Sequence, residues 1–111
     1  MIRFIPIRKS DLLADARGHG AMLEKALTRK PACRFVSLCG TAGDTLIAVL
    51  ESCGPEEADD REFVFSPLEA DSESFEGVSA AVRRRYEADY STLATFFINR
   101  TMWGLFARKK R

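Results

Sequence analysis

The stretch "LIAVL", residues 46–50, is apolar at every position. A strand with one solvated face alternates apolar and polar residues, whereas a strand covered on both faces is apolar throughout. The stretch therefore predicts a strand that is covered on both faces. It belongs to the second arm of a β-hairpin predicted for residues 33–52, in which "GTAGD", residues 40–44, supplies a tight connection.

Two further strands and one helix are predicted around this hairpin. Residues 2–7, "IRFIPI", have the composition of a short strand, and Pro6 places it at a sheet edge or makes its end. Residues 61–68, "REFVFSPL", predict a strand that stops at its proline. A helix is predicted over residues 11–29, because apolar residues recur at helical spacing after Ser10, a good N-cap residue.

The C-terminal part of the chain shows helical spacing from about Glu73 onward. Its large apolar residues step by three or four positions: Phe75, Val78, Val82, Tyr86, Tyr90, Leu93 and Phe97. A helix unbroken to Lys109 would span roughly 55 Å at 1.5 Å per residue, whereas a compact chain of this length has a radius of gyration of only about 13 Å. We therefore predict a long C-terminal helix that either breaks near residues 99–104 or packs on another subunit.

These elements predict an α+β fold in the order β-α-β-β-β-α, with a four-stranded, mostly antiparallel sheet and two helices. The whole chain, residues 1–111, is expected to form a single domain. Two apolar sheet faces and only two helices favour a homodimer, and the alternative is a monomer with one helix on each face. The interface is assigned to apolar residues of the outer sheet face and of the C-terminal segment: Phe35, Ile47, Val49, Phe97, Met102, Trp103, Leu105 and Phe106.

Charge is segregated along the chain. Residues 51–76 contain ten acidic residues and one basic residue, whereas residues 77–111 contain eight basic and two acidic residues. An acidic middle beside basic ends argues against a surface for nucleic acid. It permits acidic loops of one copy to meet basic helix ends of another, or the chain to fold its own opposite charges together.

The hydropathy and the cysteines of the chain also predict its cellular compartment. No stretch reaches 18 consecutive apolar residues, so we expect no transmembrane segment, and the N-terminus lacks the pattern of a signal peptide. The three cysteines form no CxxC pair, which fits reduced thiols better than a disulfide framework. We expect a cytoplasmic protein.

Three consecutive arginines, Arg83, Arg84 and Arg85, are followed by Tyr86 and form the candidate ligand-binding residues. Three adjacent helical residues spread over more than half a turn, so one arginine must border the apolar stripe. Arg85 follows Val82 by three positions, which places its stem along that stripe. Together with the basic tail, the cluster could hold a phosphate or another anion. A solvated basic face is the competing interpretation.

The only histidine, His19, lies between Gly18 and Gly20. As a general base it would need an orienting partner, and Asp15, four residues earlier, could supply one. The sequence offers no recognisable nucleophile or oxyanion loop, so we assign no catalytic residue. The two glycines instead predict a bend in the first helix or a close crossing by another backbone, such as the C-terminal helix.

The cysteines do not predict a metal site. Cys33, Cys39 and Cys53 match a zinc ligand set with His19 in number only, because structural zinc ligands usually come in close pairs. Buried, unreactive thiols are the favoured interpretation. We therefore predict no metal and no cofactor.

Nothing in the sequence specifies a reaction. We predict a small, non-catalytic protein-interaction or regulatory domain that self-associates as a homodimer and can also bind a protein partner. The alternative is a small-ligand or anion-binding domain that uses Arg83, Arg84 and Arg85. A third hypothesis, from another class, is a small enzyme that uses His19 with Asp15 or a cysteine.

Overall fold

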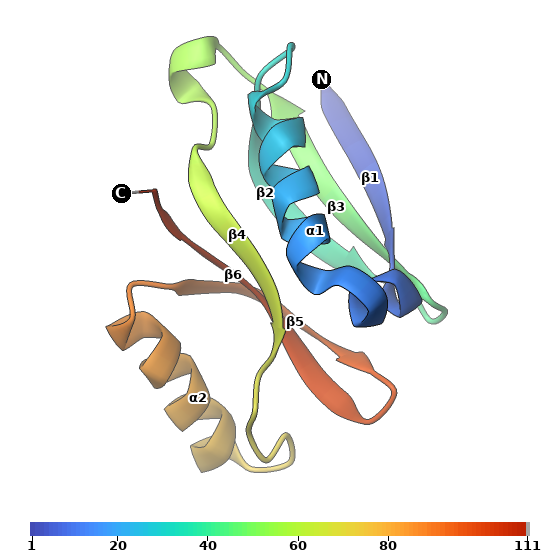
Figure 1. Cartoon of the computed structure of the whole chain (residues 1–111), viewed down its shortest axis with the longest axis vertical. Helices are drawn as coiled ribbons and strands as arrows, with labels where there is room; N and C mark the ends of the chain where they lie inside the picture. Colours follow the sequence, from blue (N-terminus) through green and yellow to red (C-terminus); the bar gives the residue numbers. More distant parts are fainter. Residues whose placement is uncertain (111) are drawn as a thin grey trace.

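The computed structural model describes residues 1–110, and within them two helices accompany six strands in two antiparallel sheets (Figure 1). In the first sheet, β3 (Thr45–Ser52) lies between β1 (Ile2–Arg8) and β2 (Cys33–Gly40). In the second sheet, β6 (Thr101–Lys109) lies between β4 (Arg61–Pro67) and β5 (Ser91–Ile98). The helices are α1 (Lys9–Thr28) and α2 (Phe75–Glu87), and a 3₁₀ turn, η1 (Pro55–Glu57), precedes β4.

The predicted single four-stranded sheet is wrong. β4 does not join the hairpin of β2 and β3 but pairs with β6, a segment for which the sequence predicted a helix. A strand needs a partner for its backbone hydrogen bonds, and the C-terminal hairpin of β5 and β6 supplies one to β4. The observed order is therefore β-α-β-β-β-α-β-β, with the second helix inside the chain rather than at its end.

The predicted long C-terminal helix is also wrong, because α2 ends at Glu87. Asp89 has a left-handed φ of 69°. The Tyr90 N–H donates to the Arg85 carbonyl at 2.9 Å, and the Asp89 N–H donates to the Tyr86 carbonyl at 3.0 Å. These two bonds make a Schellman motif, which closes a helix and usually has glycine at its left-handed position. Because this position holds Asp89 instead of glycine, the sequence does not mark the end of the helix.

The residues after Asp89 form a β-hairpin of β5 and β6. The two-residue connection begins at Asn99, whose φ of 55° suits asparagine better than most residues. The break expected near residues 99–104 thus falls at a turn between two strands. In β6, Trp103 and Leu105 face one side of the second sheet and join the main core, whereas Phe106 faces the other side and packs with α2.

The first sheet agrees with the predicted hairpin, and Pro6 lies on an edge strand as expected. In β3 the side chains alternate in burial: Leu46, Ala48 and Leu50 are buried, whereas Ile47 and Val49 are half-buried. Only one face of this strand is therefore covered within the chain. The buried side packs against α1, which lies across the first sheet in Figure 1.

Helix α1 shows both features that its glycines predict. Asp15 has non-helical angles, and its side chain accepts a hydrogen bond from the Gly18 N–H at 2.9 Å, so it caps the second part of a kinked helix. Gly20 is buried against the Phe63 carbonyl, where a β-carbon would overlap the oxygen. The crossing backbone belongs to β4, not to a C-terminal helix.

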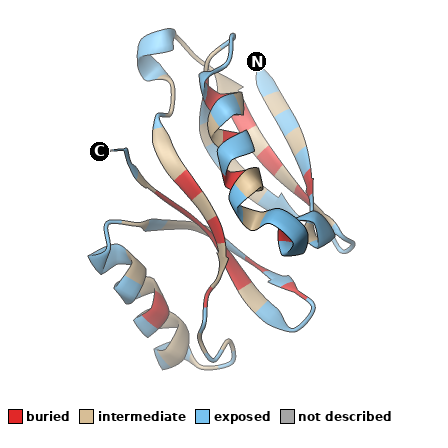
Figure 2. Cartoon of the chain, in the orientation of Figure 1, coloured by how far each residue is buried: buried red, intermediate tan, exposed pale blue. Residues whose placement is uncertain are grey.

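The main core lies where the first sheet, α1 and the second sheet meet, and Figure 2 shows buried residues along α1, β3, β4 and β6. Two of its aromatic members, Phe63 and Phe65, come from β4, and Phe35 packs on Phe63 with 5.7 Å between ring centroids. A smaller cluster under α2 contains Leu68, Ala81 and Phe106. Neither helix of residues 1–110 is long and apolar enough to cross a membrane.

Candidate functional site

The face of the first sheet that points away from α1, called the outer face below, follows from the strand register. Phe4 of β1 pairs with Val49 of β3, and Val49 faces Ser37 of β2. A bulge between Phe35 and Ser37 places Val36 beside Ser37, opposite Val49. Directly paired residues share one face of a sheet, so Phe4, Val49 and Val36 form one apolar row across all three strands.

This row is open to solvent. Phe4 is 66% exposed, Val36 is 49% exposed, and Ile2, next to the row, is 54% exposed. The next row contains Pro6 and Ile47, paired with each other. Large apolar side chains that cluster on a surface mark interaction sites, whereas isolated ones need no explanation. The outer face comprises Ile2, Phe4, Pro6, Val36, Ile47 and Val49.

Ion pairs lie at both ends of the outer face. Arg34 of β2 and Glu51 of β3 pair at 2.7 Å at one end. Arg8 of β1 and Asp44 pair at 3.4 Å at the other end. The Ser10 hydroxyl donates to Asp44 at 2.8 Å and holds the pKa of that carboxyl below its usual range. An apolar centre with a polar rim is the ordinary anatomy of a protein interface.

The β1 edge beside the outer face is blocked against strand addition. The Lys9 N–H bonds to the Asp44 carbonyl and the Ser52 N–H to the Met1 carbonyl, so odd-numbered residues of β1 make the hydrogen bonds to β3. The backbone of Pro6 therefore faces the free edge, where proline offers no N–H. A partner on this side is therefore expected to meet the face of the sheet rather than extend its β1 edge.

The structure divides the predicted interface residues. Ile47 and Val49 lie on the outer face as predicted, but Phe35 pairs with Leu50 and faces the core. Simple alternation assigned Phe35 to the wrong face, because the bulge between Phe35 and Ser37 shifts the register by one residue and turns Phe35 toward the core. Of the C-terminal residues, Trp103, Leu105 and Phe106 are buried within the chain, Met102 is half-buried, and Phe97 is exposed on β5.

The predicted arginine cluster does not converge. The guanidinium of Arg85 lies 4.3 Å from the centroid of the Phe106 ring and donates to the Ser66 hydroxyl at 2.9 Å. Arg85 thus follows the apolar stripe, as its spacing indicated, and covers the cluster under α2. Arg83 and Arg84 are exposed on α2.

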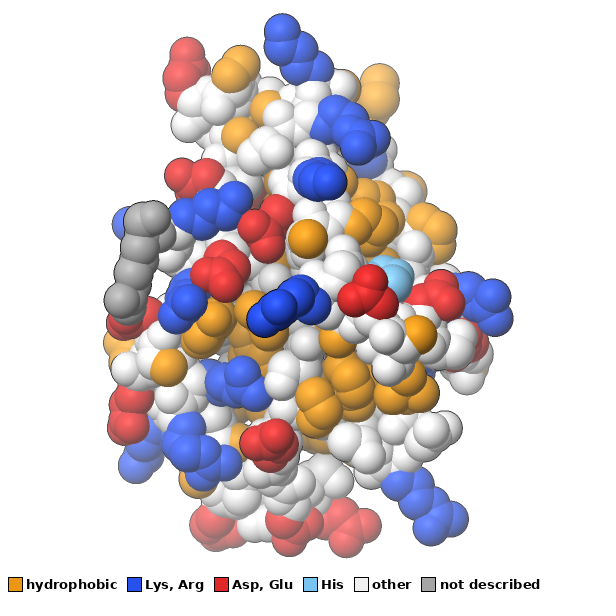
Figure 3. Space-filling view, in the orientation of Figure 1, with side chains coloured by type: hydrophobic (Ala, Val, Ile, Leu, Met, Phe, Trp, Pro, Cys, Tyr) orange, Lys and Arg blue, Asp and Glu red, His pale blue; other side chains and the backbone are white. Residues whose placement is uncertain are grey.

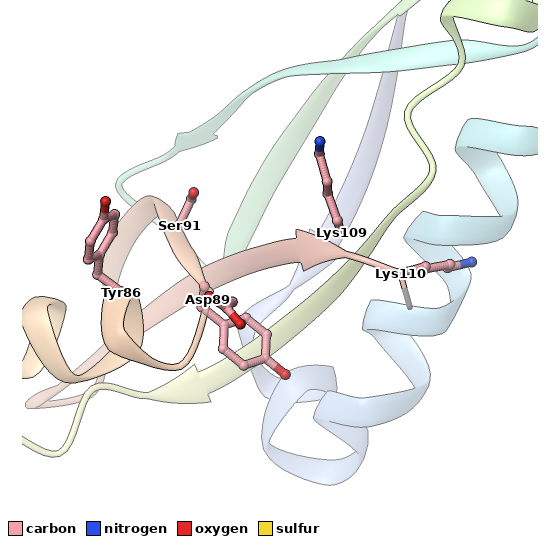
Figure 4. Close-up of a pocket in the computed structure, with 6 residues that line it drawn as sticks. Tyr86, Asp89, Ser91, Lys109 and Lys110 are labelled. Carbon is pink, nitrogen blue, oxygen red and sulfur yellow. The ribbon is translucent and has the colours of Figure 1, made fainter.

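Tyr86 lines a separate cavity of about 440 Å³ where α2 meets β5 and β6. Asp89, Tyr90 and Ser91 line the same cavity, together with Lys109 and Lys110. In Figure 4, Lys110 points toward α1 and away from Tyr86, in keeping with its ion pair to Glu24 at 3.2 Å. The lining side chains therefore do not meet around a common point.

The contacts of His19, Asp15 and the cysteines, the candidate catalytic groups, do not form a catalytic arrangement. The Asp15 carbonyl lies 2.7 Å from the Nδ1 atom of His19 and accepts a hydrogen bond from the ring at the kink of α1. Cys33 is buried, Cys39 is exposed, and desolvation together with Glu57 raises the pKa of the Cys53 thiol. Within residues 1–110 no cluster of histidine, cysteine and acidic side chains could hold a metal ion.

The sequence analysis did not assign four residues of the outer face: Ile2, Phe4, Pro6 and Val36. In "IRFIPI" the even-numbered residues Ile2, Phe4 and Pro6 share one face of a strand, and this alternation could have identified all three. No comparable signal marks Val36, because its orientation depends on the bulge.

Comparisons with protein-family models, with curated proteins and with solved structures find no match.

Proposed function

We propose that this chain is a small, non-catalytic protein-interaction domain that forms a homodimer through the outer face. The observation that carries this proposal is the apolar row of Phe4, Val49 and Val36, which crosses all three strands and is open to solvent. Covering such a row removes apolar surface from water and stabilises the complex.

A second copy of the chain suits this surface. The rim charges are already paired within the chain, Arg34 with Glu51 and Arg8 with Asp44, so two copies can approach without net repulsion between their rims. Two antiparallel sheets pack face to face about 10 Å apart when each presents an apolar face. A twofold axis would place the same patch on both sides of the interface.

The size of the outer face sets the expected strength of the dimer. Three strands about 4.8 Å apart, with seven residues of about 3.3 Å each, make a face of about 14 Å by 23 Å. A standard stable interface buries about 800 Å² on each partner. The outer face is smaller than this, so we expect a dimer that forms with increasing protein concentration.

The compartment proposed for this dimer is the cytoplasm. All three cysteines are free thiols, which suits a reducing environment.

Sedimentation equilibrium over a wide concentration range tests the proposal. The wild-type chain is expected to shift from monomer to dimer, whereas Phe4→Glu, which places a charge in the apolar row, is expected to stay monomeric. Phe97→Glu is the matched control, because Phe97 is an exposed phenylalanine on β5 of the other sheet. A wild-type chain that stays monomeric, or a Phe4→Glu variant that dimerises normally, would contradict the proposal.

A further inference from the structure

A second concave surface lies between β1 and α1, on the opposite side of β1 from Phe4. It has a volume of about 530 Å³, within the range of small-molecule sites. We call it the β1–α1 groove. Figure 3 shows Lys and Arg side chains beside hydrophobic ones over α1. The groove is lined by Arg3, Ile5, Gly18, Ala21, Met22, Lys25, Ala26 and Arg29.

The helix side of the groove follows from spacing. Gly18, Met22 and Lys25 share one face of α1, and Arg29, the residue that caps its C-terminal end, follows at the same spacing, so the four span about 16 Å. Small residues beside them, such as Ala21, leave the space that makes the surface concave.

The groove has an apolar half and a basic half. β1 and α1 run in opposite directions, so the start of β1 lies beside the end of α1 (Figure 1). Arg3 is therefore at the same end as Lys25 and Arg29. Ile5 lies further along, toward Met22 and Gly18.

The basic half carries cations without a carboxylate. Arg3 is half-buried, and its guanidinium donates to the Cys33 sulfur, a weak acceptor, at 3.8 Å. In the described part of the chain, neither Lys25 nor Arg29 forms an ion pair with an acidic side chain. The lining contains no acidic residue, whereas three other cavities are each lined by at least one.

A structural role accounts for only part of this arrangement. Lys25 lies in the last turn of α1, where a cation interacts favourably with the helix dipole. Arg3 lies on β1, where no helix dipole accounts for its charge. A half-buried guanidinium without an anion has lost hydration that a bound anion would compensate.

We propose that the β1–α1 groove binds a small anionic amphiphile. Its carboxylate would be held by Arg3, Lys25 and Arg29, and its aliphatic tail would lie along Ile5 and Met22. Because one half of the groove is basic and the other apolar, it favours a ligand with an anionic group at one end and an apolar tail at the other. The site does not depend on the proposed dimer, because Arg3 and Ile5 point to the α1 side of the first sheet and Phe4 points away from it.

Isothermal titration calorimetry with decanoate, below the concentration at which it forms micelles, tests the proposal. Decanoate is expected to bind the wild-type chain, and acetate, which has the head without the tail, at least tenfold more weakly. Decyltrimethylammonium, which has the same tail with a positive head, is expected not to bind. The methyl signals of Ile5 and Met22 should shift in NMR spectra as decanoate binds.

Two charge-reversal variants provide the matched comparison. Lys25→Glu with Arg29→Glu should lower the affinity for decanoate at least tenfold, whereas Arg83→Glu with Arg84→Glu makes the same charge change on α2 and should leave the affinity unchanged. Met22→Glu should also weaken binding, through repulsion in the apolar half, and it keeps the test decisive if the double variant does not fold.

Three results would overturn the proposal: decanoate does not bind, the positively charged amphiphile binds as tightly, or both double variants bind equally. A shift of Ile47 and Val49 in place of Ile5 and Met22 would place the ligand on the outer face and would also overturn it. Binding by Phe4→Glu at wild-type affinity would confirm that the groove acts independently of dimerisation.

Discussion

The carbonyl oxygen of Phe63 lies directly against Gly20, at the point where α1 crosses β4. A hydrogen bond also ties this stretch of β4 to α1, because the Phe63 N–H donates to the Glu24 carboxylate at 3.3 Å. The free edge of β4 is thereby covered by the helix, and both sheets are joined through α1.

Gly20→Ala should be strongly destabilising, because the new β-carbon would meet backbone that cannot rotate away. We expect a loss of about 1 to 3 kcal/mol in the free energy of unfolding, measured with urea. Gly18→Ala is the matched comparison. Its β-carbon would meet the Asp15 side chain, which can rotate, so a gain in helix propensity should offset much of the lost cap. Equal effects of the two substitutions would show that Gly20 is not a crossing point.

Asp15 caps the second part of α1 through its bond to the Gly18 N–H. Asp15→Ala should lower the free energy of unfolding by about 1 kcal/mol, whereas Asp15→Asn should stay close to wild type, because asparagine caps equally well. Urea denaturation of the two variants gives the comparison. If asparagine were as harmful as alanine, the charge rather than the cap would be the important property.

Asp59 joins the start of β4 to the first sheet. Its side chain, only 8% exposed, accepts two hydrogen bonds from the Arg61 guanidinium, at 2.9 and 2.7 Å, while its N–H donates to the Cys33 carbonyl. Burial alone would raise the pKa of Asp59, but the hydrogen bonds and positive charge of Arg61, together with a backbone hydrogen bond from Phe35, outweigh it and hold the pKa below the ordinary value of 3.8.

A lowered pKa means that the Asp59 carboxylate stabilises the fold above its unfolded-state pKa, and that this stabilisation is lost as the pH falls through the folded-state pKa. Asp59→Asn should therefore cost about 1 to 2 kcal/mol at pH 7. The difference from wild type should shrink below pH 3.8. Denaturation curves across this range provide the measurement, and a difference that grows on acidification would reverse the sign we assign.

Arg85 acts as a packing residue of the second sheet. Arg85→Ala removes the guanidinium from the Phe106 ring and from the Ser66 hydroxyl, and should lower the free energy of unfolding by about 1 to 2 kcal/mol. Arg84→Ala, an exposed change on the same helix, should stay within about 0.5 kcal/mol of wild type. Thermal unfolding of both variants tests this, and similar melting temperatures would argue against the packing role.

The first half of the fold could be predicted from the sequence. The turn residues of the β2–β3 hairpin, the proline in β1 and the glycines of α1 each predict a local feature that the structure contains. The second half could not be predicted in the same way. Phe96, Phe97 and Ile98 are consecutive apolar residues, which fit a helical stripe and a strand equally well.

The end of α2 is the clearest case of a missing local signal. Asp89 adopts a left-handed conformation that glycine usually provides. Because no glycine marks this position, the helical spacing of apolar residues continues in the sequence past Glu87, where the helix ends. For the candidate site, Ile47 and Val49 could be identified from the apolar run. The outward position of Val36 and the inward position of Phe35 both depend on the bulge between Phe35 and Ser37, so neither was available from alternation alone.

We propose that two copies of this chain meet through the outer face. An isotope-filtered NOE experiment on a mixture of labelled and unlabelled chains, at a concentration where the dimer forms, detects the contacts between the two copies. We predict intermolecular contacts from the methyl groups of Val36, Ile47 and Val49 to the ring of Phe4. A dimer that gave no such contacts, or gave them only from residues of α2 and β5, would contradict the claim.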